Sequence, residues 1–236
     1  MTLKLRTNMS AAIQSETLTR SVEDYLKAIY QLSPEGRPAS TSEIAHLLAL
    51  SAPSVTGMVK RLSEHGLLEH IPYRGVQLTE EGRRAALRMV RRHRLIEAYL
   101  VEFLGYSWDT VHAEAERLEH AVSDTMIERM AAALGNPTVD PHGDPIPAPD
   151  GSIHELAGSA LTEIPVGETV EIHRVHESQP ERLRYIASLG LRPGVRVTVV
   201  DRQPFDDLVT IEVGGLRHVI GRELGHVLQC SSAEGA

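Results

Sequence analysis

The spacing of apolar residues changes at residues 136–151, a segment that carries five prolines. Before this segment, apolar residues recur mainly at helical intervals, as at Val22 and Leu26. After it they alternate with polar residues, as in residues 195–199, which is the pattern of strands with one buried face. We therefore expect an α+β protein, in which a largely helical part precedes a small β-barrel over about residues 160–230.

The first third of the chain, residues 19–79, has the order of elements of a winged helix-turn-helix domain. An amphipathic helix is expected near its start, and Ser40 with Glu43 forms a capping box that begins a second, short helix. Ser51 can cap a third helix, which Gly66 would end. The pattern predicts three short helices around one small core.

Two extended runs follow, residues 67–71 and 76–78, and they predict a β-hairpin wing with Arg74 at its tip. In such a domain the third helix enters the major groove by its N-terminal residues, and nearby basic side chains meet phosphates. We expect the following residues to face DNA: Ser51, Pro53, Ser54, Thr56 and Gly57 toward bases, and Lys60, Arg61 and Arg74 toward phosphates. The alternative is a helical bundle with a hairpin and no ligand.

The net charge of −8 conceals two oppositely charged blocks. Residues 51–94 carry nine Lys and Arg against four Asp and Glu, whereas residues 95–160 carry two against twelve. A basic block indicates an anionic polymer as partner, and an acidic block indicates cations.

The acidic block contains a stripe of potential metal ligands. On a helix, four of its side chains fall within an arc of about 100°; they are His112, Glu116, Glu119 and His120. The two glutamates repel each other, and a divalent cation would turn that repulsion into attraction. The preceding helix offers a second imidazole–carboxylate pair, His93 and Glu97, at i,i+4. The alternative is a solvated charged face.

The middle of the chain predicts three helices, the first over residues 80–104 and the next capped by Ser107 or Asp109. Their apolar faces exceed what three helices can hide, so we expect a homodimer. The single cysteine, Cys230, suits a reducing cytoplasm, and no apolar run is long enough to cross a membrane. The expected divisions are a flexible arm 1–18, a DNA-binding domain 19–79, a metal-binding and dimerisation domain 80–150, and a barrel domain 151–236.

Several segments together resemble the diphtheria toxin repressor family of metal-dependent regulators, in its manganese-responsive type. They begin at Asp24 (DYLKAIY), Ser51 (SAPSVT), Arg92 (RHRLIE) and His112 (HAEAERLEH). The resemblance covers residues 20–150 closely, including the run PHGDPIP after the helices. Residues 160–230 are similar to the family's SH3-like (FeoA-like) barrel.

The resemblance implies two metal sites. One would use Asp24, Glu116, Glu119 and His120. The other would use His93, Glu97 and His112, completed from the barrel by Glu177, with His176 and Gln179 as further candidates.

The resemblance also bears on the choice of metal. The iron-responsive branch has Met and Cys where this chain has Asp24 and Glu116, and the manganese branch has carboxylates at both positions. Hard oxygen ligands suit Mn²⁺. Lys27 stands where the manganese branch has a Glu, which favours separate sites over a two-metal cluster. Gly57 replaces a base-reading Gln of the iron branch, so the operator sequence cannot be carried over.

These observations predict a cytoplasmic, homodimeric, Mn²⁺-dependent regulator that binds a palindromic operator in double-stranded DNA and represses manganese uptake genes. We expect no enzymatic activity, no membrane partner and no small-molecule substrate. Three alternatives remain: the same protein sensing Fe²⁺, a metal-independent winged-helix regulator, and a metal-dependent hydrolase, for which the chain has no H-E-x-x-H motif.

Overall fold

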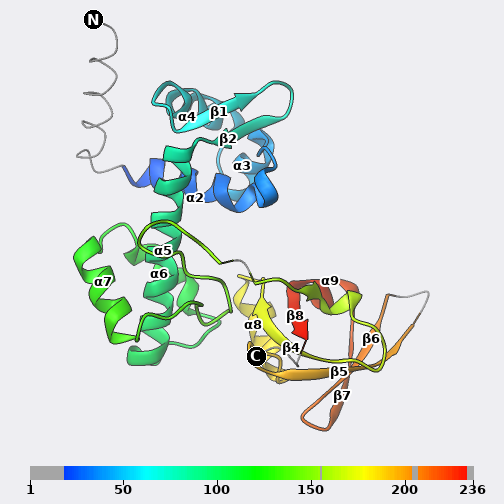
Figure 1. Cartoon of the computed structure of the whole chain (residues 1–236). Helices are drawn as coiled ribbons and strands as arrows, with labels where there is room; N and C mark the ends of the chain where they lie inside the picture. Colours follow the sequence, from blue (N-terminus) through cyan, green and yellow to red (C-terminus); the bar gives the residue numbers. More distant parts are fainter. Residues whose placement is uncertain (1–18, 155, 204–206, 233–236) are drawn as a thin grey trace, which may run out of the picture. The chain divides into compact units, whose positions relative to one another are not determined.

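The computed structural model describes residues 19–154, 156–203 and 207–232 (Figure 1). The predicted arm, residues 1–18, lies outside these residues. The chain forms two compact units that divide between Met89 and Val90, inside the long helix α5 (Glu80–Leu104). No described helix is both long and apolar enough to cross a membrane.

The N-terminal unit has the predicted winged helix-turn-helix order. Its elements are α2 (Arg20–Leu32), the 3-10 turn η1 (Pro34–Gly36), α3 (Thr41–Leu47), α4 (Ala52–Glu64), β1 (Leu68–Ile71), β2 (Gly75–Leu78) and the start of α5. Their apolar stripes meet in one core, in which Leu26, Ile29, Ile44, Val55 and Leu62 are buried.

Local capping fixes where α3 and α4 begin. The Ser40 hydroxyl accepts from the Glu43 N–H at 3.2 Å, and the Ser40 N–H donates to the Glu43 carboxylate at 2.9 Å, which confirms the capping box. Ser51 accepts from the Ser54 N–H at the start of α4. Helix α4 ends at Glu64, two residues before the expected stop at Gly66.

The helical part of the C-terminal unit contains the rest of α5, α6 (Val111–Leu118) and α7 (Asp124–Ala133). Leu95, Ile96, Val111, Ala115 and Ile127 form its core. After this packing, several large apolar side chains stay exposed on the described part of the chain, among them Phe103, Leu104, Tyr106 and Met126.

Two predictions about α6 are wrong. Ser107 and Asp109 do not cap it, because the Ser107 hydroxyl pairs with Thr110 and the buried Asp109 pairs with Arg184. The helix also ends at Leu118, where the N–H groups of the following turn bond back to the Leu118 carbonyl. Of the expected stripe, the helix therefore carries only His112 and Glu116.

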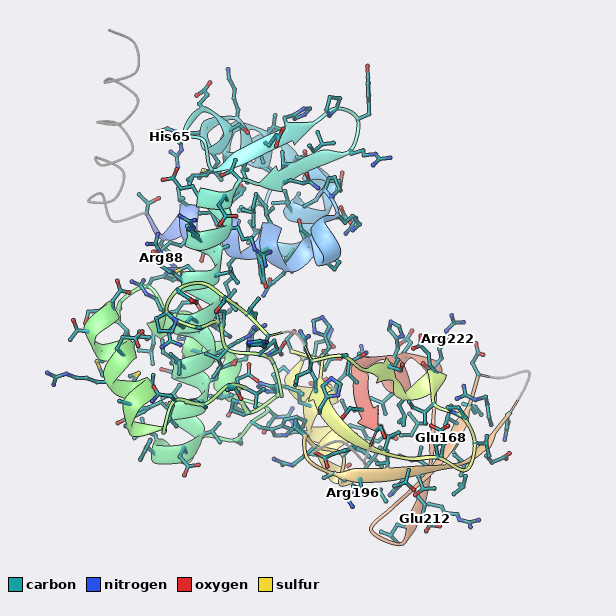
Figure 2. All side chains as sticks on the ribbon, viewed as in Figure 1. His65, Arg88, Glu168, Arg196, Glu212 and Arg222 are labelled. Atoms are coloured by element: carbon teal, nitrogen blue, oxygen red, sulfur yellow. The ribbon has the colours of Figure 1, made fainter. Side chains whose placement is uncertain are left out.

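The C-terminal residues form a six-stranded antiparallel sheet of order β3-β8-β4-β5-β6-β7 (Figure 1). Its elements are β3 (Ser159–Ala160), β4 (Thr169–Val175), α8 (Pro180–Ser188), β5 (Arg196–Arg202), β6 (Val209–Val213), β7 (Leu216–Ile220), α9 (Arg222–Val227) and β8 (Leu228–Ser232), with the 3-10 turn η2 (Leu161–Glu163). Alternation buries Val197, Val199 and Ile211 in the core, while Arg196 and Glu212 lie on the solvent side (Figure 2). Helix α9 was not expected from the sequence.

The proline-rich segment between helices and sheet is irregular but packed. Ile146 joins the helical core, and Asp140 and His142 are buried. Conversely Trp108, from the loop before α6, belongs to the core of the sheet domain. The helical part of the C-terminal unit thus contributes Trp108 to the core of the sheet, and the proline-rich segment contributes Ile146 to the core of the helices.

Candidate metal centre and DNA-binding surface

Three side chains from α5 and α6 form a compact cluster of metal-binding groups. His93 and Glu97 are one turn apart on the buried face of α5, and His112 lies in the first turn of α6. His93 Nε2, His112 Nδ1 and Glu97 Oε1 are each 3.0 Å from the other two. The two helices thus bring two nitrogens and one oxygen to the corners of a nearly equilateral triangle.

This triangle fits a divalent cation. Ligand atoms that sit at right angles on an ion, with bonds of about 2.1 Å, lie about 3.0 Å apart. Burial raises the pKa of Glu97, but the charge of His93 and hydrogen bonds from His112 and His93 outweigh it, so the pKa lies below its usual value. The carboxylate is therefore ionised and ready to bind a metal ion.

Glu119 orients the His93 ring. Its Oε2 lies 2.5 Å from His93 Nδ1, and its Oε1 lies 3.5 Å from His120 Nε2. A carboxylate can only accept, so in the metal-free protein His93 donates from both ring nitrogens, from Nδ1 to Glu119 and from Nε2 to Glu97. A metal ion would take the place of the Nε2 proton, while Nδ1–H stays on Glu119. This is the arrangement in which a carboxylate fixes the tautomer of a metal-binding histidine. In the C-terminal unit, Glu119 thus contacts His93 as well as its predicted co-ligand His120.

A second cluster shares Glu97. The side chains of Glu97, Asp140 and His142 are all buried and offer ligand atoms within 4.8 Å of one another. Glu97 turns Oε1 toward the first cluster, and its Oε2 lies 3.9 Å from His142 Nδ1. The carboxylate of Glu97 therefore lies between two groups of potential ligands.

Trp108 sets the orientation of His142. The His142 Nε2–H donates to the Trp108 carbonyl oxygen at 2.7 Å, which leaves the lone pair on Nδ1, the nitrogen that faces Glu97. The two rings also stack, with centroids 5.4 Å apart, and the Arg192 guanidinium lies 4.9 Å from the Trp108 ring. Gly143 must be a glycine, because its φ is +85° and a Cβ would lie 1.9 Å from the His173 carbonyl oxygen.

Asp140 is held in an acidic environment. Burial, and then the charges of Asp144 and Glu97, raise its pKa well above the usual value, against the opposing charge of Arg94. Arg94 lies 3.7 Å from Asp140 and 3.1 Å from Asp144, and Asp144 also pairs with Arg174 of β4. A cation at this cluster would compete with the proton, for which the buried carboxyl has a raised affinity.

The other predicted ligands lie outside these clusters. Glu116 is 56% exposed on α6, with its carboxylate 3.7 Å from His112 Nε2. Asp24 lies on α2 of the N-terminal unit, and its expected role with Glu116, Glu119 and His120 stays a prediction. Glu177 follows β4, where it binds Arg182 and accepts from the N–H groups of the next two residues, Ser178 and Gln179. His176 is exposed, and partial desolvation together with the charge of Arg174 lowers its pKa.

Sequence reasoning did not assign Asp140 and His142 as ligands. Asp140 directly precedes the run PHGDPIP, and His142 is the second residue of that run. An acid and a histidine next to glycine and prolines, in a segment that must cross a packed interface, are the signal that could have identified them. The only cysteine, Cys230, is buried in the sheet core, where burial raises the pKa of its thiol to about 12.

The expected DNA-facing residues lie together on the N-terminal unit. Val55, Val59 and Leu62 bury one face of α4. The other face exposes every predicted contact on this helix, namely Ser51, Pro53, Ser54, Thr56, Gly57, Lys60 and Arg61. The Thr56 hydroxyl donates to the Ala52 carbonyl at 2.9 Å. A Cβ at Gly57 would meet nothing within 4 Å. The exposed face of α4 therefore has no bulky side chain at Thr56 or Gly57 that would keep DNA away from the helix. Arg74 is exposed in the wing turn.

Known proteins match nearly the whole chain. Residues 17–76 match the iron dependent repressor N-terminal DNA-binding domain, residues 79–148 match the iron dependent repressor metal-binding and dimerisation domain, and residues 160–230 match the FeoA domain. The iron-dependent repressor IdeR of Mycobacterium leprae is 34% identical over 90% of this chain and 97% of its own length. A manganese-dependent transcriptional repressor solved in complex with manganese superposes with a TM-score of 0.83 and 39% identity, covering 89% of this chain and 99% of that one. The apo form of the manganese-activated repressor ScaR gives 0.77 and 33%, with the same coverage.

Proposed function

The chain belongs to the iron-dependent (diphtheria toxin) repressor family, and from this premise we propose that it is a repressor that responds to Mn²⁺. Repressors of this family bind operator DNA as dimers and depend on a divalent metal ion, so the chain is a metal-dependent DNA-binding transcriptional repressor and not an enzyme. The identity of the metal, the residues that bind it and the regulated genes are the content of the proposal.

The triangle of His93, Glu97 and His112 carries the proposal. Its donors are two imidazole nitrogens and a carboxylate oxygen, at the spacing of ligands around one six-coordinate ion. The second cluster shares Glu97 and adds one imidazole and one further carboxylate, those of His142 and Asp140. No sulfur atom belongs to either cluster. Mn²⁺ accepts such a set, whereas thiolate and thioether ligands favour softer ions.

The metal preference rests on Asp24 and Glu116. Both are hard oxygen donors at positions where the iron-responsive branch is expected to have sulfur. The manganese-dependent repressor that superposes at a TM-score of 0.83 supports the same choice. Fe²⁺ is the second candidate, favoured by the likeness to an iron-dependent repressor over 90% of the chain.

We propose two metal sites, as the family resemblance implies, and add Asp140 and His142. Asp24, Glu116, Glu119 and His120 would hold the first ion. His93, Glu97 and His112 would hold the second, with the Glu97 carboxylate extending toward Asp140 and His142. Glu177 would join this site only after it releases Arg182, because Arg182 and two N–H groups occupy both of its oxygens.

The metal would act by selection between conformations. An ion shifts an equilibrium only as far as it prefers one state, and a change from 1:99 to 99:1 needs a preference of about 10⁴-fold. Ligands drawn from several elements supply that preference, because only one arrangement completes the coordination. We propose that this arrangement holds the two DNA-binding domains of a cytoplasmic dimer at operator spacing, and that the genes repressed are those of manganese uptake.

Binding to the chain's own promoter tests the function. DNA binding should be lost in chelator and restored by Mn²⁺, and Fe²⁺ should restore it no better than Mn²⁺ under anaerobic conditions. Glu97→Gln should abolish the restoration, while the matched variant Glu102→Gln, which removes an exposed carboxylate from the same helix, should behave as wild type. Undiminished specific binding in excess chelator would contradict the proposal.

A further inference from the structure

Tyr73 at the tip of the wing is unusual in two respects. Its side chain is 107% exposed, more than any other large apolar residue of the described chain. Its backbone adopts a φ of +64°, in the left-handed region. No hydrogen bond, ion pair or ring contact involves the Tyr73 side chain among the described residues. The Tyr73 ring therefore makes no contact in the described residues that would stabilise the fold.

The left-handed backbone conformation makes a tyrosine at position 73 unfavourable for the stability of the fold. The left-handed region suits glycine or asparagine, and a bulky aromatic residue there is an outlier. Residues held in such conformations are concentrated at functional sites, because the surrounding structure imposes a geometry that function requires. A glycine at position 73 would fit this turn better than the tyrosine that is present.

The wing beneath Tyr73 is firmly attached to the domain. Val76 and Ala39 exchange two backbone hydrogen bonds of 2.9 Å, and the Gln77 side chain donates to the Gly36 carbonyl. Gly75 packs so closely that a Cβ would lie 2.1 Å from the Ala39 carbonyl oxygen. Strand β2 is thus fixed along its length, and the turn lies at the end of the hairpin remote from α4 (Figure 1). The ring projects from a rigid support.

The surroundings of the tip are basic. Arg74 follows Tyr73 and is exposed. A hollow of about 730 Å³ beside the turn is lined by Arg37, Arg74 and Gln77, together with Pro34, Pro38 and Ile71. Arg37 also pairs with Glu43, so Arg74 is the cation of this hollow without a carboxylate partner within the described residues. A phosphate backbone that follows this surface would bring a groove edge to Tyr73.

We propose that Tyr73 is a specificity-determining residue that enters the DNA minor groove beside each half-site and selects A·T base pairs there. The inference rests on the proposed function, because it requires α4 in the neighbouring major groove. The floor of the minor groove at A·T pairs offers only acceptors, adenine N3 and thymine O2, and the tyrosine hydroxyl is a donor. The guanine 2-amino group is itself a donor and obstructs the groove. Arg74 strengthens the preference, because narrow A·T-rich minor grooves attract arginine.

The probe for the test is a duplex selected from a random pool by the Mn²⁺-loaded full-length protein. The selected duplexes should have A·T pairs flanking each half-site. Changing these flanks to G·C should weaken wild-type binding about fivefold, and inosine·C flanks should restore it, because they combine the minor-groove edge of A·T with the major-groove edge of G·C. Selected sites without a flank preference would overturn the proposal.

Two variants separate the ring from its hydroxyl. Tyr73→Phe should lose most of the discrimination between A·T and G·C flanks with little change in folding. Tyr73→Gly should bind the selected duplex about fivefold more weakly, while its melting temperature stays the same or rises, because glycine relieves the backbone strain. Equal flank discrimination by wild type and Tyr73→Gly would overturn the proposal.

Failure of the proposed function would look different. In that case Mn²⁺ would enrich no sequence from the pool, or enrichment would be the same in chelator. If Mn²⁺ enriches a DNA sequence but the Tyr73 variants discriminate between flanks as wild type does, the repressor function stands and only the role of the wing is refuted.

Discussion

The metal clusters of the C-terminal unit and the DNA-facing surface of the N-terminal unit differ in how their charges are held. Glu97 and Glu119 are each 2% exposed, and the buried His93 places both of them by hydrogen bonds from its two ring nitrogens. Lys60 is 78% exposed, and within the described residues its carboxylate partner is Glu64, at 4.0 Å. Buried polar groups must be satisfied by fixed partners, whereas exposed charges stay hydrated until a partner arrives. Metal binding should therefore respond sharply to single changes, and DNA binding should respond gradually.

The largest effect is expected from the carboxylate between the two clusters. Glu97→Gln removes the anionic ligand and should weaken binding of the metal at this site by about 100-fold or more, above the loss of about 10- to 100-fold for a residue that only orients a ligand. Isothermal titration with Mn²⁺ measures it, against Glu102→Gln as control. If Glu97→Gln and Glu102→Gln bind Mn²⁺ with similar affinity, the buried Glu97 carboxylate is no more important for metal binding than the exposed one of Glu102.

Glu119→Gln sharpens the comparison within the C-terminal unit. The amide keeps the shape of the carboxylate but weakens the charge-assisted bond to His93. We expect metal affinity to fall by about 10-fold. This expectation concerns the site of His93, Glu97 and His112, where Glu119 only orients the His93 ring. If Glu119→Gln weakens metal binding at this site as much as Glu97→Gln does, Glu119 is a direct ligand there as well as in its proposed site beside His120.

Lys60→Ala tests the exposed surface. It should weaken binding to every DNA duplex. The slope of the logarithm of the binding constant against the logarithm of the salt concentration should become less steep by about one, because one phosphate contact is lost. Thr56→Ala should instead relax sequence preference. Arg217→Ala, which removes an exposed cation from β7, is the control. Identical behaviour of Lys60→Ala and Thr56→Ala would show that α4 does not enter the major groove as placed here.

The pH dependence should follow Asp140. Its raised pKa means that the folded, metal-free protein holds this proton more tightly than the unfolded chain does. The resulting stability is present at low pH and is lost as pH rises through the folded-state value, and metal affinity should rise over the same interval because the ion displaces the proton. Asp140→Asn should remove both trends in melting curves and titrations, whereas Asp201→Asn, exposed on β5, should leave them unchanged.

The smallest effect is expected at the capping box. Side-chain hydrogen bonds from Arg37 and Ser40 lower the pKa of Glu43 to about 2. Its contribution to stability is therefore present above the usual glutamate value and lost as pH falls toward 2. Ser40→Ala should cost about 1 kcal/mol in chemical denaturation. A loss several times larger would mean that α3 depends on this cap more than on its packing.

The winged helix-turn-helix was predictable because its signals are local. Ser40 with Glu43, Ser51, and the apolar stripe of α4 each fix one element boundary within a few residues. The pairing of His93 with Glu97 was equally local, one turn of one helix. The register of β4 to β8 and the presence of α9 depend on long-range pairing, which alternation alone does not specify.

The parts that could not be predicted depend on tertiary contacts. Asp109 is an ordinary N-cap candidate in sequence, but its pairing with Arg184 takes it away from α6. Glu119 is spaced as the third of four residues in a helical stripe, yet it follows the last residue of α6, and its carboxylate contacts His93. Asp140 and His142 reach Glu97 through an irregular segment, for which no periodicity exists to be read.

The central claim is that Mn²⁺ binds between α5 and α6. Anomalous diffraction at the manganese absorption edge, from crystals grown with Mn²⁺, tests it directly. The account predicts a peak at about 2.1–2.2 Å from His93 Nε2, His112 Nδ1 and a carboxylate oxygen of Glu97. Manganese peaks elsewhere, with these three atoms still hydrogen-bonded to one another at 3.0 Å, would contradict it.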